Sequence, residues 1–150
     1  MTRQRGFSLI ELVVVMVLMA TLAGLGAAAL NAGLPGQRLR GAAREIAAEL
    51  RFTRAQAIAT GREQVFELDV RSRRWTAAGK REGRIDANLE LVATSARDER
   101  PALEVAAVRF FPDGAATGGR FVLKRGQAAW RVDVAWLTGE VTLRRGEGAP

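Results

Sequence analysis

The pattern of hydrophobic and polar positions changes twice along the chain, near residue 31 and near residue 62. From Phe7 to Leu30 the side chains are apolar or small, and Glu11 is the one strongly polar exception. At about 1.5 Å of rise per residue, a helix of this length extends roughly 36 Å, which is enough to cross a bilayer. We therefore predict a transmembrane helix over residues 7–30.

A second helical period, with a narrow apolar stripe, runs over residues 31–61. The stripe consists of residues three, four or seven positions apart: Leu39, Ala43, Ile46, Leu50 and Ala57. Charged residues, among them Glu49, take much of the remaining surface, and Gly61 is placed as a C-cap. Pro35 predicts that the membrane helix ends or kinks before this amphipathic helix begins. We expect the stripe to pack on the chain's own sheet; the alternative is packing on neighbouring subunits.

From residue 62 onward the period becomes two, which is typical of strands. In the run Val65–Val70, the side chains of Phe66 and Leu68 share one face and those of Glu67 and Asp69 the other. Six or seven strands are expected, over residues 65–70, 74–77, 89–94, 103–111, 119–124, 129–136 and 141–145. With no helix between them they favour antiparallel sheets, β-sandwich-like, in a domain over residues 62–150. The predicted fold class is thus α+β, a long N-terminal helix packed on antiparallel sheets.

The segments between these strands are expected to be irregular. Residues 78–86 are charged and Gly-rich and are predicted to form a loop. Residues 95–101 are the best candidate for a mobile loop, and residues 144–150 are predicted to be a frayed tail.

The composition restricts the chemistry that the chain can perform. It contains no Cys, His or Tyr, which excludes disulfides, thiolate metal sites and Ser-His or Cys-His nucleophiles. No Asp-rich loop suggests calcium binding. Glu67 and Asp69 share a strand face, but a solvated face explains them better than a catalytic carboxylate pair. We predict no enzyme, no cofactor and no metal.

The net charge is +7, and it comes almost entirely from arginine. Two groups combine basic residues with an aromatic ring: Arg71, Arg73 and Arg74 beside Trp75, and Lys124 and Arg125 close to Trp130. Such a basic surface suits base stacking beside phosphate contacts. It also suits a solvated hairpin with a core tryptophan, which is the interpretation we favour.

Glu11 is the unusual feature of the apolar run. An unpaired charge in hydrocarbon costs about 2.5–3.5 kcal/mol on insertion scales, so an intramembrane carboxylate indicates a function and a partner. A cleavable secretory signal ending near Ala27–Ala29 does not fit, because its apolar core would be only about 7–15 residues long. Arg3 and Arg5 precede the run, and by the positive-inside rule the N-terminus stays cytoplasmic.

The stretch Gly6-Phe7-Ser8-Leu9-Ile10-Glu11-Leu12 resembles the class III signal of type IV pilins and type II secretion pseudopilins. The resemblance implies a leader over residues 1–6, cleavage by prepilin peptidase between Gly6 and Phe7, and methylation of the new amino group of Phe7. It also implies a partner for Glu11, the N-terminal amine of a neighbouring subunit. A carboxylate and an ammonium lower each other's cost of burial in a low dielectric.

A second segment, Phe110 to Gly119, is similar to the aromatic-x-Pro-x-Gly-x-x-x-Gly-Gly stretch of the GspH and FimT group of minor pseudopilins and minor pilins. Physically it is a strand that ends at Pro112, an Asp-Gly turn and a Gly-Gly entry into the next strand. A phosphate-binding nest is the weaker interpretation, because no Lys-Thr or Lys-Ser follows.

Together these resemblances imply a minor pseudopilin of the type II secretion system, a structural subunit of a short periplasmic pseudopilus that helps export folded proteins across the outer membrane. Its implied partners are other major and minor pseudopilins, prepilin peptidase and the inner membrane, with a single span and the C-terminal domain in the periplasm. The alternative is a FimT-like minor type IV pilin that binds DNA for uptake.

Overall fold

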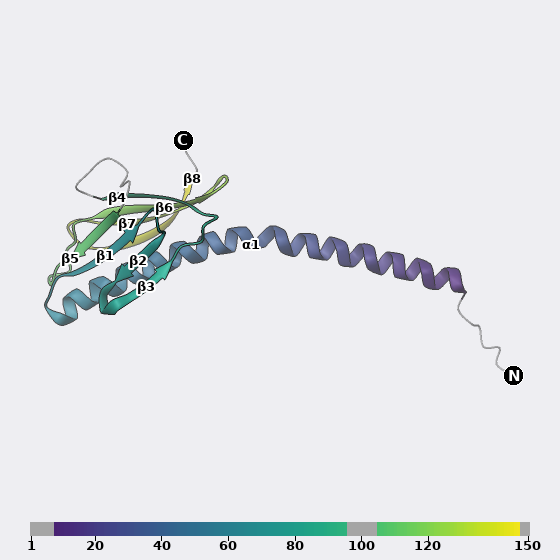
Figure 1. Ribbon diagram of the computed structural model, residues 1–150, viewed down its shortest axis with the longest axis horizontal. Coiled ribbons are helices and arrows are strands. Elements are labelled where there is room, and N and C mark those ends of the chain that lie inside the picture. The colour runs from purple at the N-terminus through teal and green to yellow at the C-terminus, as the bar shows by residue number, and fades with distance from the viewer. Residues whose placement is uncertain (1–7, 96–104, 148–150) are drawn as a thin grey trace. The chain divides into compact units, whose positions relative to one another are not determined.

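The computed structural model describes residues 8–95 and 105–147, and for residues 25–35 it describes the backbone alone. The chain divides into two compact units, Met1–Pro35 and Gly36–Pro150. The second unit holds the strands and the part of the long helix that they cover (Figure 1). The predicted mobile loop at 95–101 lies outside the described residues except for Ser95, which ends a strand.

The helix α1 runs from Leu9 to Thr60, and its backbone is helical on both sides of Pro35. Of the two alternatives predicted at Pro35, an end or a kink, the end is therefore wrong. Proline removes one backbone donor, but the alanine, leucine and arginine residues around it favour helix, and the chain remains helical. The predicted end is correct, since Gly61 follows the last helical residue with a φ of 61°, the left-handed conformation of a C-cap.

Among the described residues eight strands form two antiparallel sheets of four. The first has the order β3-β2-β1-β5, with β1 at Gln64–Asp69, β2 at Arg74–Ala77, β3 at Arg81–Arg84 and β5 at Val105–Phe110. The second has the order β4-β6-β7-β8, with β4 at Glu90–Ser95, β6 at Gly119–Arg125, β7 at Ala128–Val134 and β8 at Val141–Glu147. The predicted α+β fold of a helix on antiparallel sheets is confirmed.

Two local predictions are wrong. Residues 78–84 are not a loop, because a short 3-10 helix, η1 at Ala78–Lys80, leads into the edge strand β3. The side chains of β3 are mostly charged, so the strand does not show the alternating hydrophobic pattern from which strands were predicted. Charged residues are nevertheless common on edge strands. Residues 144–147 are not a frayed tail either, because they pair with β7 in β8, where Arg145 lies opposite Trp130.

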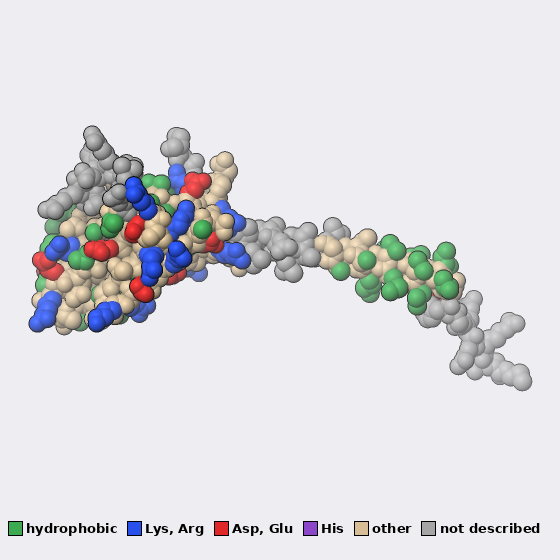
Figure 2. Space-filling model, in the orientation of Figure 1, with side chains coloured by type: hydrophobic (Ala, Val, Ile, Leu, Met, Phe, Trp, Pro, Cys, Tyr) green, Lys and Arg blue, Asp and Glu red, His purple; other side chains and the backbone are tan. Residues whose placement is uncertain are grey.

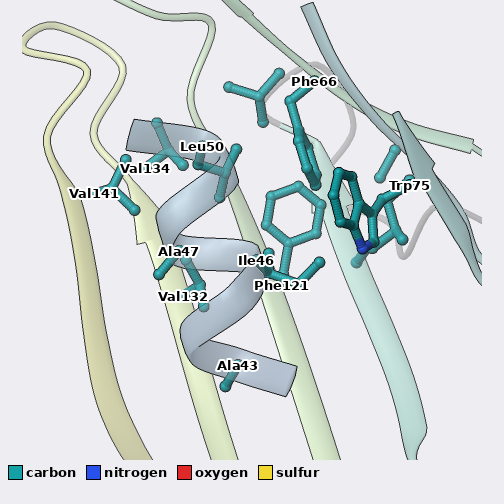
Figure 3. Close-up of a cluster of buried hydrophobic side chains, with 14 of the residues drawn as sticks. Ala43, Ile46, Ala47, Leu50, Phe66, Trp75, Phe121, Val132, Val134 and Val141 are labelled. Carbon is teal, nitrogen blue, oxygen red and sulfur yellow. The ribbon is translucent and has the colours of Figure 1, made fainter. Parts of the chain in front are cut away.

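The core of the second unit lies between α1 and both sheets (Figure 3). All five residues of the predicted stripe are at most 1% exposed, so the expectation that the stripe packs on the chain's own sheets is confirmed. Ile46 and Leu50 pack with Phe66 of one sheet and Phe121 of the other. The two phenyl rings meet edge to face at 5.6 Å, and Phe66 also stacks with Trp75 at 6.2 Å.

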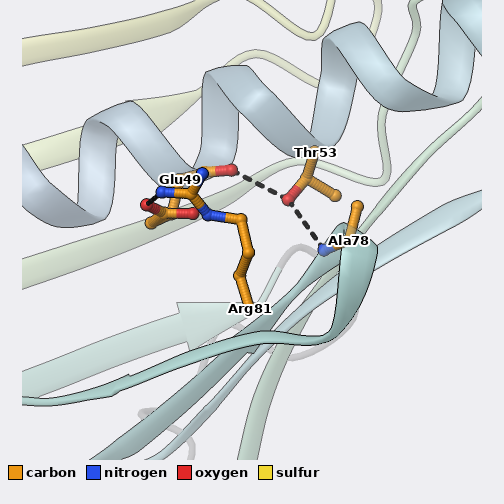
Figure 4. A network of polar contacts seen from close by, with 4 residues as sticks. All are labelled: Glu49, Thr53, Ala78 and Arg81. Atoms are coloured by element: carbon orange, nitrogen blue, oxygen red, sulfur yellow. Dashed lines mark hydrogen bonds and ion pairs between the residues drawn. The ribbon is translucent and has the colours of Figure 1, made fainter.

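A polar network joins the buried side of α1 to β3 (Figure 4). Arg81 Nη2 donates to Glu49 Oε1 at 2.5 Å, and the Arg81 guanidinium lies 4.7 Å from the centre of the Phe52 ring. Thr53 Oγ1 donates to the Glu49 carbonyl at 2.8 Å and accepts from the Ala78 amide. Glu49 was expected on the surface and is instead 5% exposed, because β3 supplies the cation that makes its burial tolerable.

Substitution of Arg81 by alanine should therefore destabilise the second unit. It leaves the Glu49 carboxylate buried without its cation, which should cost about 1–3 kcal/mol, given that Arg81 itself is half exposed. Urea unfolding of the fragment 36–150, followed by tryptophan fluorescence, measures the change. Arg74→Ala is the matched control, because its pair with Glu82 is exposed and 3.4 Å long, and it should cost less than about 0.5 kcal/mol. Equal losses in both variants would contradict the assignment.

Candidate functional site

The first unit presents an uncovered apolar helix. Every described side chain from Ser8 to Gly24 is exposed, including those of Leu9 at 82%, Met16 at 66% and Leu22 at 65%. Figure 2 shows hydrophobic side chains along this segment. The Thr21 hydroxyl donates to the Leu18 carbonyl at 2.8 Å, so this polar group is satisfied within the helix.

Glu11 lies in the first turn of α1, where a carboxylate is favoured by the positive end of the helix dipole. The backbone amides of Glu11 and Leu12 donate to the Ser8 carbonyl at 3.0 and 3.2 Å. The Glu11 side chain is exposed and makes no hydrogen bond or ion pair with the part of the chain that the structure describes.

The predicted processing site, Gly6 and Phe7, lies outside the described residues. Across residues 8–95 and 105–147, no helix has the length and hydropathy required of a membrane span.

The segment from Phe110 to Gly119 forms a closed loop whose amides are already used. Gly114 N donates to the Phe111 carbonyl, Ala115 N to Asp113 Oδ1, and Ala116 N to the Trp136 carbonyl, at 2.9 to 3.1 Å. A phosphate-binding nest requires such amides to be free, so this arrangement argues against one. The loop instead ties β5 to the turn that follows β7.

Two arginines of α1 attach the helix to this loop and its neighbour. Arg54 Nε donates to the Gly114 carbonyl at 3.0 Å and Nη2 to the Thr138 carbonyl at 2.9 Å, while Arg51 Nη2 donates to the Val141 carbonyl at 2.9 Å. Gly139 has a φ of 61°, and a Cβ there would lie 2.2 Å from the Gly114 carbonyl oxygen. The glycine is therefore required by close approach of two backbones and not only by the turn.

Replacement of Gly139 by alanine should disrupt this attachment. Left-handed backbone costs an alanine about 1–2 kcal/mol, and the overlap with Gly114 should raise the total to about 2–5 kcal/mol. Gly126→Ala is the control, because Gly126 has a similar φ of 56° but open space around it. Urea unfolding of the fragment 36–150 should give a loss at least ~1 kcal/mol larger for Gly139→Ala; indistinguishable losses would contradict the role of the contact.

The basic residues of the first predicted group, at 71, 73 and 74, make different contacts. Arg74 lies on the outer side of its sheet and pairs with Glu82 at 3.4 Å. Arg73, with a φ of 58°, turns the chain back, and its Nη1 donates to the carbonyls of Asp86 and Leu89. Arg71 and Arg73 also line a hollow of about 440 Å³. Arg84 lines it as well, although the sequence did not single out this residue.

Asp86 connects the two predicted groups of basic residues. The backbone N–H of Asn88 holds the pKa of the Asp86 carboxyl below its usual range, and the positive charges of Arg38 and Arg125 lower it further. Arg125 is thus close to the carboxylate that lines the same hollow as Arg71 and Arg73. Lys124 lies opposite Glu90 across the β4–β6 pair.

The tryptophans beside these basic residues do not offer open rings. Trp75 is 4% exposed and belongs to the core, as the favoured interpretation predicted. Trp130 packs against the core on one side, and the Arg40 guanidinium lies 5.4 Å from its ring centre. Stacking of bases on either ring would require displacement of these contacts.

The predicted carboxylate pair does not form a site. Glu67 is exposed, whereas Asp69 Oδ1 accepts the backbone N–H groups of Arg71 and Ser72 at 2.8 and 2.9 Å. The Ser72 N–H lowers the pKa of the Asp69 carboxyl, so Asp69 is an ionised turn acceptor. Within the described residues, no three Asp, Glu, His or Cys side chains come together as metal ligands would.

Comparison with known proteins gives two family matches. The model described as type II transport protein GspH matches residues 42–139, and the model of the prokaryotic N-terminal methylation motif matches residues 1–27. Type II secretion system protein H of Xanthomonas campestris pv. campestris is 50% identical over 137 residues, which covers 91% of this chain and 81% of that protein.

Two solved structures share the fold. The minor pseudopilin EpsH of the Vibrio cholerae type II secretion system is 19% identical, with a TM-score of 0.57, and the match covers 76% of this chain and 99% of that one. The type IV minor pilin FimU of Pseudomonas aeruginosa is 15% identical, with a TM-score of 0.55 and coverage of 72% and 89%.

Proposed function

The chain belongs to the GspH family of type II transport proteins as a minor pseudopilin of type II secretion, and from this premise we propose how its apolar helix serves it. The precursor is anchored in the inner membrane by residues 7–30, with the β domain in the periplasm. Prepilin peptidase removes residues 1–6, and the mature chain joins other major and minor pseudopilins in the pseudopilus. The family is structural and not enzymatic.

The observation that carries the proposal is the uncovered helix of the first unit. Eleven large apolar side chains between Leu9 and Leu22 are 48–82% exposed. At about 1.5–3 kcal/mol for each side chain moved out of water, their burial is worth on the order of 15–30 kcal/mol. A helix with this surface requires an apolar environment, which the bilayer supplies to the precursor and the helices of other subunits supply after assembly.

Glu11 supplies the specificity that apolar packing lacks. Apolar helices can slide past one another with little change in free energy. A carboxylate in a low dielectric instead strongly favours the one position at which it lies opposite a cation. We infer that the carboxylate of Glu11 meets the methylated amine of Phe7 of a neighbouring subunit. Support for this pairing comes from the Glu11 side chain, which is exposed and has no hydrogen bond or ion pair with the described residues of its own chain.

Substitution of Glu11 by alanine should leave processing intact and impair assembly. The variant should lose its leader as the natural chain does, but co-purification with the other pseudopilins should fall at least ~10-fold, because removal of one partner of a desolvated pair costs on the order of 2–5 kcal/mol. The measurement is affinity purification of the chain from membranes, quantified for each partner. Glu67→Ala, an exposed glutamate of the β domain, is the control. Normal co-purification of Glu11→Ala would remove Glu11 from the mechanism.

Substitution of Gly6 by a bulky residue such as leucine should block processing. The chain should then keep residues 1–6 and remain in the inner membrane fraction, whereas the natural chain should begin at a Phe7 that carries one additional methyl group. Intact mass spectrometry of protein purified from membranes distinguishes these products. A chain that retains its leader in otherwise natural cells would overturn the processing step while leaving the role of Glu11 to its own test.

DNA capture is the competing function, and the geometry of the basic residues does not favour it. Trp75 is buried and Trp130 is covered by Arg40, so the stacking platforms that single strands use are closed. Arg73 is committed to two backbone carbonyls, and Arg74 is paired with Glu82.

A further inference from the structure

Three arginines share a hollow with Asp86 at one end of the β domain, and the charges of two more act on its carboxylate. Arg71, Arg73 and Arg84 line the hollow that includes the Asp86 side chain, and Arg38 and Arg125 lie close enough to lower its pKa. We name this set the basic collar: Arg38, Arg71, Arg73, Arg84 and Arg125. Arg71 also interacts with Asp69, and Arg73 is committed to two backbone carbonyls, but five guanidinium groups against two carboxylates still leave an excess of positive charge.

The collar is built from segments that are distant in sequence. Arg38 comes from α1, Arg71 and Arg73 from the β1–β2 turn, Arg84 from the end of β3, and Arg125 from the end of β6. Arg73 holds the β3–β4 connection through the carbonyls of Asp86 and Leu89. The fold therefore brings these charges together on a helix, on strands and on a hydrogen-bonded turn.

The collar lies at the end of the domain where the chain enters it. Arg38 is two residues beyond Gly36, which begins the second unit, and Leu39 is the first core residue. Lys and Arg side chains gather over this end of the domain in Figure 2. Arg40 adds a further charge there, over Trp130.

Chain length puts Arg38 within reach of the bilayer surface. Arg38 follows Leu30, the end of the apolar run, by eight residues, and α1 is helical throughout them, so they extend about 12 Å. The polar layer on each side of a bilayer is roughly 5–7 Å thick, so the Arg38 backbone would lie about 5–7 Å beyond the headgroups, where its long side chain can reach them.

We propose that the basic collar binds the phosphate groups of anionic phospholipids and holds the β domain against the membrane surface before assembly. This rests on the proposed membrane anchoring. Arginine is suited to the task because its planar guanidinium donates two parallel hydrogen bonds to one phosphate. Arg125 Nη1 is buried and donates to no acceptor among the described residues. Basic residues close to a bilayer are attracted to acidic headgroups, and the attraction falls off within a Debye length.

The chain carries its own pair of reporters for this contact. Trp130 lies at the collar end of the domain, under Arg40. Trp136 is 69% exposed in the turn before β8, and Arg54 of α1 donates to the Thr138 carbonyl of the same turn. Trp136→Phe and Trp130→Phe variants of the full chain each retain one of them, together with the buried Trp75. Spin-labelled headgroups quench a tryptophan only when it approaches the membrane surface.

The experiment reconstitutes both full-length variants in nanodiscs of phosphatidylcholine, with or without phosphatidylglycerol, and with a small fraction of spin-labelled lipid. Trp130 should be quenched at least ~2-fold more when phosphatidylglycerol is present, and high salt should reverse this increase. Trp136 should show no such change. Quenching of Trp130 that is independent of phosphatidylglycerol would overturn the proposal.

Substitutions then test the collar itself. Arg38→Gln, Arg84→Gln and Arg125→Gln together should abolish the effect of phosphatidylglycerol. The control combines Arg62→Gln, Lys80→Gln and Arg144→Gln, which removes the same charge from exposed positions outside the collar and should leave the effect unchanged. Circular dichroism verifies that both variants are folded. Equal loss in the two triple variants would show a net-charge effect and overturn the assignment to the collar.

Three further outcomes separate this inference from its alternatives. Failure of the chain to enter nanodiscs would refute the membrane anchoring, and the collar proposal with it. Reversal of the Trp130 effect by inorganic phosphate, but not by chloride at equal ionic strength, would identify a free-phosphate site instead of a lipid contact. Collar-dependent binding of duplex DNA, without any response to phosphatidylglycerol, would replace the lipid by nucleic acid.

Discussion

Ile46, Ala47 and Leu50 are completely buried because two sheets with no strand in common both close over the same stripe of α1. Neither sheet alone covers that stripe, since Phe66 approaches it from one sheet and Phe121 from the other. The helix is therefore the element that converts two four-stranded sheets into one domain. Any rotation of α1 about its axis would uncover the stripe from both sheets at once, so the register of the helix is fixed by the whole core.

Polar contacts fix the helix along its length as well. Glu49 and Thr53 bind the β2–β3 segment on one side. Arg51 binds the carbonyl at the start of β8, and Arg54 binds the Gly114 carbonyl in the loop after β5. Apolar packing alone tolerates small shifts along the helix, but hydrogen bonds at 2.5 to 3.0 Å do not. Burial of the core stabilises the packing of α1 on the sheets, and these hydrogen bonds fix the position of α1 along its axis.

Hydrophobic periodicity predicted what depends on burial and missed what depends on a partner distant in sequence. The stripe of α1 and the inward side chains of β1 follow from spacing alone, because burial of apolar residues is a local property of the pattern. β3 and the burial of Glu49 do not, since each is stabilised by the other: the strand supplies Arg81 and the helix supplies the carboxylate. The same limit explains the basic collar. Arg71, Arg73 and Arg125 were visible as local groups, but their union with Arg38 and Arg84 around Asp86 needed the tertiary fold.

Charged residues are distributed unevenly along the sequence of α1. Between Leu12 and Gln37 the sequence has no charged residue, and from Arg38 onward arginines recur on the exposed side of the helix. Transfer of an arginine to the centre of a bilayer is opposed by about 2.5–3.5 kcal/mol on insertion scales, so Arg38, Arg40 and Arg44 limit how far the helix enters. Glu11 lacks that protection at the other end, where the apolar sequence surrounds it. With the proposed membrane anchoring, Glu11 would need a partner inside the apolar layer, and Arg38, Arg40 and Arg44 would remain outside it. This asymmetry fits one end of the helix to other helices and the other end to the membrane surface.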